Sequence, residues 1–308
     1  MRDVRSLAIG TAFYPGVEPF LEAWYQSIQH QTDREVQLWI ALDVLDVRAA
    51  IDAMGGDPKA TWVLAQPGDT PAQVRQRLLE RIIKACDGVV LVDSDDILHP
   101  NRVAAARAAL QHSDLVGCAL RLVDADGRDS GFTLSLPANT KPEEVLPRHN
   151  VYGLSNTAWR TDLMALCLPI PDTVEIVDWF LATKAWLYGA KLSFDAAIGM
   201  DYRQHGGNMA QVRAPFSREQ VVRDTERVLH HYRLVRAAPP SGAIAVRRMQ
   251  IDEVARDVER FRTAVLASEN LLSQYLDALD ALDPAPLWWS SVAHPSLRHY
   301  WTQERETS

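Results

Sequence analysis

The chain has 308 residues, 47% hydrophobic and 23% charged, with a formal net charge of −8. This composition is typical of a soluble globular protein of one large domain, or of one domain with an extension. The acidic balance argues against a nucleic-acid-binding protein, because such proteins usually carry a basic surface.

Cysteine usage and the lack of long apolar runs indicate the cellular setting. Three widely spaced cysteines with no CxxC pair argue against zinc and thioredoxin-like motifs and favour free thiols in a reducing compartment. No segment approaches the ~20 apolar residues of a membrane-spanning helix, and the N-terminal sequence has no signal-peptide pattern. We therefore expect a cytoplasmic protein, with peripheral contact to the inner face of a membrane left open.

Short apolar runs alternate with segments of helical periodicity in the first part of the chain. Apolar side chains recur at three- and four-residue intervals over 20–28 and 74–83, which is typical of amphipathic helices. The alternation predicts an α/β fold with a mainly parallel sheet, and such sheets bind ligands at the carboxyl ends of their strands. The predicted strands are Leu7–Ile9, Val36–Leu42, Trp62–Ala65 and Val89–Val92.

The most informative segment follows the last of these strands. There the chain runs into Asp93-Ser94-Asp95-Asp96, three carboxylates in four positions. Crowded like charges raise one another's pKa unless a cation compensates, and oxygen ligands suit Mg²⁺ or Mn²⁺ together with phosphates. The alternative is an acidic helix start, in which Asp95 or Asp96 caps the next helix. We favour the metal site, because the acids follow a buried strand.

The middle of the chain carries a turn signal and another helical pattern. The sequence Asp-Ala-Asp-Gly at 124–127 lies between two apolar runs, which predicts a β-hairpin. Farther on, apolar spacing predicts a helix from about Thr173 to Gly189.

After about Arg213 the chain becomes a series of helical patterns. We expect a charged helix over Ser217–Arg236 and one long amphipathic helix over Ile244–Leu282. We favour packing of the long helix on the main domain; the alternative is a self-association seam that would make a homodimer. The aromatic tail is expected to cover the core, with a membrane edge or a partner site as the alternative. It carries Trp288, Trp289, Tyr300 and Trp301.

Several motifs occur in a fixed order between residues 7 and 208. The earlier ones are Leu7-Ala8-Ile9-Gly10-Thr11-Ala12-Phe13-Tyr14, Ser27-Ile28-Gln29-His30-Gln31-Thr32, Ala41-Leu42-Asp43, Gly68, Arg75 and Leu91-Val92-Asp93-Ser94-Asp95-Asp96. The later ones are Trp159-Arg160, Val177-Asp178-Trp179 and Tyr202-Arg203-Gln204-His205-Gly206-Gly207-Asn208. Together they resemble the family 2 inverting glycosyltransferases, which have the GT-A fold. The sequence departs from the family pattern at Gly10, where proline is usual, and at Val177, where glutamate is usual.

The resemblance implies the fold, the reaction and the residues that carry it. It implies a GT-A mixed sheet flanked by helices over residues 1–212 and a C-terminal helical extension over 213–308. It also implies a hexosyltransferase-type enzyme that moves a sugar from a nucleotide-diphosphate donor to a carbohydrate or lipid-linked acceptor, in surface polysaccharide or glycolipid synthesis. The residues implied in donor binding are Thr11, Phe13, Asp43, Gly68, Arg75, Asp93, Ser94 and Arg203. Asp95 and His205 would hold Mn²⁺ or Mg²⁺, and Asp178 would be the catalytic base, with Glu175 as the fallback acid.

Two opposite influences act on the pKa of Asp178. A position in the first turn of a helix lowers the pKa of Asp178, whereas burial raises it, and the sequence leaves the balance undecided.

Two other functions stay open. A nucleotidyltransferase would also use carboxylate-bound Mg²⁺, but the segment after the first strand has no Gly-rich loop with a basic residue. A non-catalytic nucleotide-sugar-binding module remains an alternative, because the glutamate before Asp178 is missing.

Overall fold

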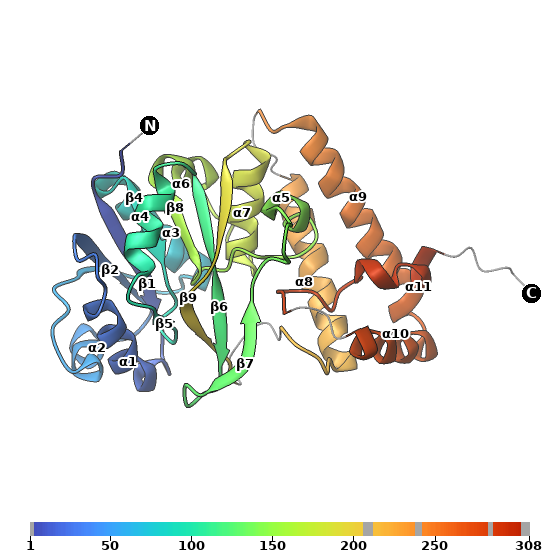
Figure 1. Cartoon of the computed structure of the whole chain (residues 1–308), viewed down its shortest axis with the longest axis horizontal. Helices are drawn as coiled ribbons and strands as arrows, with labels where there is room; N and C mark the ends of the chain where they lie inside the picture. The colour runs from blue at the N-terminus through green and yellow to red at the C-terminus, as the bar shows by residue number, and fades with distance from the viewer. Residues whose placement is uncertain (1–2, 206–211, 238–241, 283–285, 303–308) are drawn as a thin grey trace, which may run out of the picture.

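A nine-stranded mixed sheet is the centre of the part of the chain that the computed structural model describes, residues 3–205, 212–237, 242–282 and 286–302 (Figure 1). The strand order is β3-β2-β1-β4-β8-β6-β9-β5, and β7 pairs with β6. The strands are β1 (Leu7–Phe13), β2 (Val36–Leu42), β3 (Thr61–Leu64), β4 (Gly88–Leu91), β5 (Ile97–Leu98), β6 (Leu115–Val123), β7 (Asp129–Leu134), β8 (Thr157–Arg160) and β9 (Leu192–Arg203).

Parallel pairing brings the carboxyl ends of β1, β2 and β4 to one edge of the sheet. β1 lies between β2 and β4 and is parallel to both, and β3 continues the parallel set beyond β2. β8 is antiparallel to β4 and to β6, which makes the sheet mixed. The four predicted strands match β1 to β4 within a few residues, and the expected mixed sheet flanked by helices is confirmed.

Helices pack against the sheet along its length. α3 contacts β1, β2 and α6, whereas α4 contacts β4, β6 and β8. In the described residues before 206, the helices are α1 (Glu18–Gln29), α2 (Val47–Met54), α3 (Pro71–Ala85), α4 (Arg102–Leu110), α5 (Pro142–Val145), α6 (Thr161–Cys167) and α7 (Val177–Leu187). The expected helix over 173–189 is therefore confirmed in shorter form, as α7.

A capping box fixes where α3 begins. The Thr70 hydroxyl accepts a hydrogen bond from the backbone N–H of Gln73 at 3.3 Å, and the Gln73 side chain accepts one from the N–H of Thr70 at 2.7 Å. Pro71 follows at the first helical position, where its missing N–H costs nothing. This start sets Arg75 one turn into the helix, at the carboxyl edge of the sheet.

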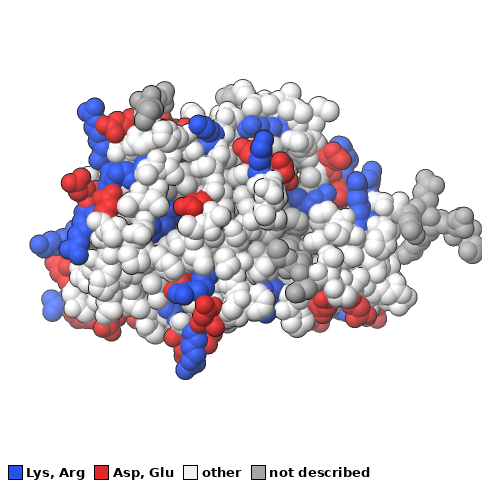
Figure 2. Space-filling model, in the orientation of Figure 1, with Lys and Arg blue, Asp and Glu red and all other residues white. Residues whose placement is uncertain are grey.

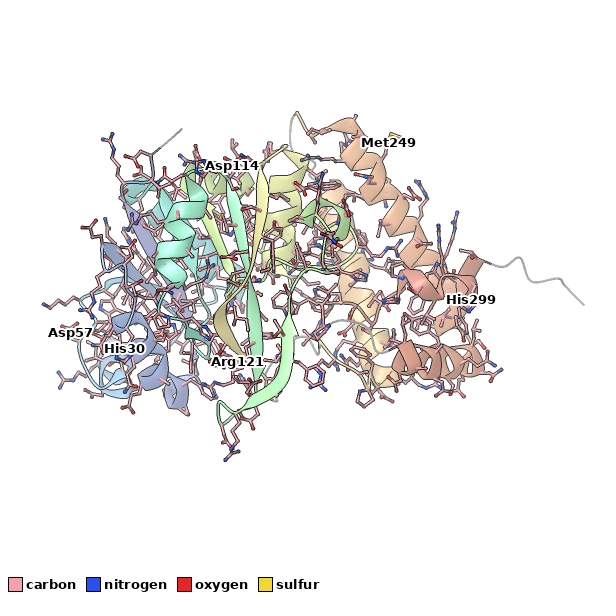
Figure 3. The ribbon with its side chains drawn as sticks, viewed as in Figure 1. His30, Asp57, Asp114, Arg121, Met249 and His299 are labelled. Carbon is pink, nitrogen blue, oxygen red and sulfur yellow. The ribbon has the colours of Figure 1, made fainter. Side chains whose placement is uncertain are left out.

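The expected hairpin is present, and it supports the last strand. β6 and β7 pair antiparallel around the predicted turn, where Gly127 has a φ of +83°. β9 runs parallel to β6. Arg121 on β6, labelled in Figure 3, donates to both carboxylate oxygens of Asp201 on β9 at 2.9 and 2.8 Å. His99 Nε2 lies 2.8 Å from the same carboxylate. These contacts hold β9 in place, so that Arg203 and His205 reach the loop after β4, residues 93–96, which we call the acidic loop.

The C-terminal helices, within 218–302, lie beside α7 (Figure 1). The prediction of one continuous helix over 244–282 is wrong: a π-helical turn follows α9, and α10 runs in another direction. The apolar spacing hides this bend, because Val265 inside the turn is as buried as the helical residues around it. The elements are α8 (Arg218–Ala237), α9 (Ala245–Phe261), the π-helical turn (Arg262–Leu266), α10 (Glu269–Leu282), a 3-10 turn (Pro295–Leu297) and α11 (His299–Thr302).

A buried ion-pair network ties the C-terminal helices to the sheet domain. Asp257 on α9 is 1% exposed and accepts hydrogen bonds from Arg148 at 2.7 Å, from the Trp301 indole at 2.9 Å and from Arg298 at 3.2 Å. Burial raises the pKa of Asp257, but the donors from Trp301 and Arg148 outweigh it and the pKa is lowered. Packing on the main domain is therefore observed, whereas the division at residue 212 and the homodimer remain predictions.

Charged and apolar side chains both reach the surface of the described residues. Among the described helices, none combines the length and apolar character needed to cross a membrane. Acidic and basic side chains are interspersed on the face that Figure 2 presents. The cysteines are buried free thiols, and the exposed apolar side chains include Met249 on α9 (Figure 3).

Candidate active site

A cavity of about 740 Å³ opens at the carboxyl edge of the parallel strands. Its walls come from the ends of β1 and β2, the start of α3, the acidic loop after β4, the segment leading into α7, Tyr202 on β9 and two residues before the 3-10 turn. The lining residues are Ala12, Tyr14, Asp43, Thr70, Pro71, Ala72, Val74, Arg75, Asp93, Asp95, Leu154, Asp172, Thr173, Val174, Glu175, Ile176, Val177, Asp178, Tyr202, Trp288 and Trp289. Segments far apart in the sequence thus meet at one ligand-sized cavity. It lies at the carboxyl ends of the strands, where α/β sheets bind their ligands.

Asp93 is held at the mouth of β4 by Ser155. The Ser155 hydroxyl accepts a hydrogen bond from the Asp93 N–H at 2.8 Å and donates one to Asp93 Oδ2 at 3.1 Å. Arg75 on α3 places a guanidinium nitrogen 3.7 Å from Asp93 Oδ1. Desolvation raises the pKa of Asp93 and the charge of Asp95 adds to this rise, while Arg75 opposes it. Asp93 and Arg75 therefore form a charged pair on the cavity wall.

Asp95 faces His205, the predicted second metal ligand. Asp95 Oδ2 and His205 Nε2 are 2.9 Å apart, and the imidazole stacks on Phe20 with ring centroids 5.3 Å apart. A carboxylate and an imidazole so placed fit two positions around Mn²⁺ or Mg²⁺. Within the described residues no cluster of three or more His, Cys, Asp or Glu side chains could hold a metal ion alone. Further ligands would have to come from elsewhere, and donor phosphates supply them in many Mg²⁺ sites.

Asp96 lies behind the cavity wall rather than on it. It is 1% exposed; Oδ1 accepts the Arg203 N–H at 2.8 Å, and Oδ2 has no hydrogen-bond partner among the described residues. Burial, followed by the charges of Asp95 and Asp93, raises the pKa of Asp96 well above its ordinary value. The three acids thus avoid mutual repulsion in part because one is held toward its neutral form.

Arg203 braces the acidic loop. Its Nε donates to the Asp95 carbonyl and its Nη1 to the Ala125 carbonyl, each at 2.8 Å, and its guanidinium lies 5.0 Å from the centre of the Phe20 ring. The side chain is 5% exposed and does not line the cavity. This geometry connects the hairpin turn, β9 and the loop that carries Asp95.

Asp178 lies in the first turn of α7, on the side of the cavity next to the acidic loop. Its Oδ2 accepts a hydrogen bond from the Asn150 amide at 2.9 Å, and its Oδ1 accepts the Trp179 N–H at 2.7 Å. Burial raises the pKa of Asp178 to about 7, although the Trp179 N–H lowers it. The rise in pKa caused by burial is thus larger than the fall caused by the position at the helix start. The carboxyl group has a pKa that suits a general base near neutral pH. Glu175 also lines the cavity, but it pairs with Arg227 at 3.2 Å.

The structure brings some predicted site residues to the cavity and places others elsewhere. Asp43, Arg75, Asp93, Asp95 and Asp178 line it, and His205 joins through Asp95. The other predicted donor-binding residues do not line it; they are Thr11, Phe13, Gly68, Ser94 and Arg203.

The local geometry explains these placements. Phe13 packs edge-on against Trp24 with ring centroids 5.1 Å apart, and the Thr11 side chain is buried within β1. The Ser94 hydroxyl donates to the Ala12 carbonyl at 3.0 Å, which fixes the acidic loop against β1. Gly68 adopts a φ of +87° in the turn before α3. The predicted segment 206–208 lies outside the described residues.

Sequence reasoning missed five residues of the site. Ser155 and Asn150 orient Asp93 and Asp178, and no motif or spacing in the sequence marks them. Tyr14 lies within the matched segment at the end of β1. The tandem aromatic pair Trp288 and Trp289 was expected to cover the core, and this is confirmed, since the two residues are 5% and 4% exposed; that they also border the cavity was not predicted.

Comparison with known proteins supports the fold. No family model and no curated protein matches the sequence. Among solved structures, S. aureus TarS 1–349 in complex with UDP-GlcNAc matches with a TM-score of 0.60 and 16% identity, over 88% of this chain and 78% of that chain. The same fragment in complex with UDP gives 0.59 and 16%, over 89% and 79%. Mannosyltransferase PcManGT from Pyrobaculum calidifontis, in complex with GDP-Man and Mn²⁺, gives 0.54 and 12%, over 98% and 89%.

These matches and the strand order define the class of fold. The chain has the GT-A fold of these glycosyltransferases, as the sequence predicted. Since a fold hosts many functions, the activity has to be argued from the cavity itself.

Proposed function

We propose that the chain is a metal-dependent, inverting glycosyltransferase of the family 2 type. It transfers a sugar, of the hexosyl kind, from a nucleotide-diphosphate donor to the hydroxyl of a carbohydrate or lipid-linked acceptor. The observation that carries this proposal is the meeting of Asp93, Asp95 and Asp178 at one cavity of about 740 Å³. Asp93 and Asp95 form the side of the cavity that would bind the donor and the metal ion, and Asp178 would be the base.

The donor side contains the charged groups that a nucleotide diphosphate needs. Asp95 and His205 would hold Mn²⁺ or Mg²⁺, which neutralises the leaving diphosphate when bound. Arg75, paired with Asp93, is the cation on the cavity wall that can bind phosphate oxygens. Asp43 at the end of β2 would accept hydrogen bonds from the nucleoside. Ser94 and Arg203 act in this proposal by holding the acidic loop, and Thr11, Phe13 and Gly68 by shaping the scaffold.

Asp178 supplies the base for the acceptor. The acceptor hydroxyl oxygen forms a bond to the anomeric carbon while the bond from that carbon to the diphosphate oxygen breaks. The leaving diphosphate takes the bonding electron pair, and Asp178 takes the hydroxyl proton. A single displacement of this kind inverts the anomeric centre and needs one base, which agrees with the valine at 177 in place of a second acid.

The cellular role in this proposal is synthesis of a surface polysaccharide or glycolipid at the cytoplasmic side of a membrane. A peripheral protein would reach a lipid-linked acceptor without a membrane-spanning helix. TarS is in complex with UDP-GlcNAc and the mannosyltransferase with GDP-Man, so UDP- and GDP-sugars are the first donors to compare.

Thermal unfolding with a panel of nucleotide sugars tests the proposal. UDP-, GDP-, dTDP- and CMP-sugars are added with and without Mn²⁺, because a ligand that binds the folded state raises the Tm. We expect one nucleotide class to raise the Tm, more with Mn²⁺ than without, and Asp95→Asn to remove the Mn²⁺ effect. Asp57→Asn, which changes an exposed carboxylate in the segment after α2, is the matched control.

Two results would contradict the proposal. Binding of no nucleotide sugar would remove the donor assignment. Metal-dependent nucleotide binding without transfer of sugar to any acceptor or to water would favour the non-catalytic module, whereas release of pyrophosphate from a nucleoside triphosphate would favour a nucleotidyltransferase.

A further inference from the structure

An exposed apolar surface lies at the start of α9, outside the cavity. Ile244, Val246 and Met249 are 38%, 60% and 67% exposed, and Figure 3 shows the Met249 side chain pointing out of the molecule. They are three of the nine large apolar side chains that are exposed in the described residues, although they lie within six positions of the chain. Single exposed apolar residues are normal, whereas a concentration of them marks a binding surface.

The same part of the chain is basic. Residues 233–251 contain no aspartate or glutamate, in a chain whose net charge is −8. The arginines in this stretch are Arg233, Arg236, Arg247 and Arg248. Of the two acids that follow, Asp252 pairs with Arg236 at 2.7 Å, which leaves Glu253 against the other three arginines. The start of α9 therefore combines apolar side chains with an excess of positive charge.

The start of α9 is fixed against the end of α7. The Ile244 N–H donates to the Leu187 carbonyl at 3.0 Å. The Arg247 guanidinium lies 5.3 Å from the centre of the Trp186 ring and donates to the Trp186 carbonyl. The exposed side chains are therefore presented by a helix that is held in place on the sheet domain.

An anionic lipid surface matches both properties of this helix start. Apolar side chains enter the boundary between headgroups and acyl chains, and arginines attract the negative charge of the lipids. Side chains that project from one end of a helix also suit a fluid surface, which needs no matching shape. A second copy of the chain would instead bring a like positive charge to the same surface.

We propose that the start of α9, with Ile244, Val246, Arg248 and Met249, is a docking surface for a membrane that contains anionic lipids. The inference rests on the proposed function for its purpose, because docking brings the enzyme to a lipid-linked acceptor. It assigns the contact to one helix, apart from the residues that bind the donor.

The docking surface and the proposed base lie at opposite ends of α7. Asp178 is in the first turn of this helix of 11 residues, and Leu187, which contacts Ile244, is its last residue. At about 1.5 Å per residue, roughly 15 Å separate the two ends. A bilayer at the docking surface would therefore leave the cavity open, and the reacting sugar of a lipid-linked acceptor would stand off the bilayer on an extended glycan.

Co-sedimentation of the full chain with vesicles, without nucleotide, tests this surface. Vesicles of phosphatidylcholine are compared with vesicles that also contain phosphatidylglycerol, at low and at high salt. We expect binding to the anionic vesicles that weakens as salt screens the arginines. Arg248→Gln should lower the partition coefficient about fivefold, which corresponds to about 1 kcal/mol for one arginine near an anionic surface. Met249→Ser should lower it about tenfold, because less apolar area enters the lipid.

Two matched controls change equally exposed residues elsewhere. Leu64→Ser replaces a 62% exposed side chain on β3, and Arg48→Gln replaces an 83% exposed one on α2. In Figure 1, α2 lies at the opposite end of the molecule from α9. Both controls should bind vesicles as the wild type does.

Several results would overturn the inference. They are absence of binding to the anionic vesicles, equal binding to the two kinds of vesicle, and wild-type binding in both Arg248→Gln and Met249→Ser. A dimer in sedimentation velocity that Met249→Ser dissociates, without any binding to vesicles, would assign the surface to a second copy and overturn it too.

The outcome is independent of donor binding. Vesicle binding by a protein whose Tm no nucleotide sugar raises would support the docking surface and contradict the proposed function. A nucleotide-induced rise in Tm without vesicle binding would contradict only the docking surface.

Discussion

The side-chain amide of Asn150 donates a hydrogen bond of 2.9 Å to Oδ2 of Asp178. Asn150 is fully buried, and its own Oδ1 accepts the Tyr152 N–H at 3.0 Å, so the direction of its amide is fixed. The backbone of Asn150 bridges to Trp288. One residue thus joins the carboxylate proposed as base to the C-terminal segment that carries Trp288.

We expect Asn150→Ala to slow transfer about tenfold to a hundredfold, because it removes a group that orients the base. The amide N–H stabilises the ionised form of Asp178, so its loss also raises the pKa of that carboxyl. The pH at which the rate reaches half its plateau should therefore move upward. A rate–pH profile with saturating donor measures both effects. An unchanged profile in Asn150→Ala would contradict the assigned role, and Asn101→Ala, an exposed asparagine, is the control.

The raised pKa of Asp178 also predicts how stability depends on pH. Since its folded pKa of about 7 exceeds the ordinary value of 3.8, ionisation opposes folding, and this opposition grows as pH rises from about 4 to 7. Asp178→Asn removes the titration. We expect the variant without ligands to be more stable than the wild type by about 1 kcal/mol or more at pH 8, and by less at pH 5. Urea unfolding at the two pH values measures the difference, and an advantage that does not change with pH would contradict the pKa.

Close packing at Gly153 predicts the effect of a single methyl group. A Cβ there would lie 2.7 Å from Trp288 Cη2, so Gly153→Ala must displace the indole and should destabilise the protein by about 1–3 kcal/mol. Gly56→Ala is the matched control, because its Cβ would meet only Tyr25 Cε1 at 3.9 Å. Thermal unfolding compares the two variants. Equal Tm values for Gly153→Ala and the wild type would mean that Trp288 is free to move.

The Asp257 network predicts that the C-terminal helices and the sheet domain unfold together. Asp257→Ala leaves Arg148 without its buried carboxylate, and breaking such a pair costs about 3–5 kcal/mol. We expect a lower Tm in thermal unfolding, because Arg148 and Asp257 join the sheet domain to α9. Asp252→Ala, which removes a more exposed pair with Arg236 on α8, should cost less than about 1 kcal/mol. Equal losses for the two variants would contradict the structural role of Asp257.

Hydrophobic periodicity and the acidic motif predict most of the sheet and the position of the acidic residues at the cavity. The strands before residue 93, the hairpin at 124–127 and the position of Asp178 at a helix start follow from local patterns, because burial on one or both faces dictates their residue types. The side chains at the end of β1 show the limit. Alternation along a strand sends Ala12 and Tyr14 to the cavity and Thr11 and Phe13 to the other face, and a motif match does not say which set faces the ligand.

The rest depends on contacts between distant segments. The apolar spacing over 244–282 continues through a π-helical turn, so the sequence does not reveal where α9 ends. Ser155 and Asn150 act only through the places to which the fold brings them. Arg203 has the charge expected of a phosphate ligand, but backbone carbonyls at Asp95 and Ala125 accept its hydrogen bonds.

The central claim is that Asp178 is the base and the acidic loop is the donor site of one cavity. The most direct test is to measure donor affinity and transfer rate together in Asp178→Asn, with Mn²⁺ and the donor sugar selected by thermal unfolding. The account predicts donor affinity within a few-fold of the wild type and a transfer rate lower by a factor of about 10³ or more, because the acceptor proton has no base. Transfer at a rate near that of the wild type would contradict it.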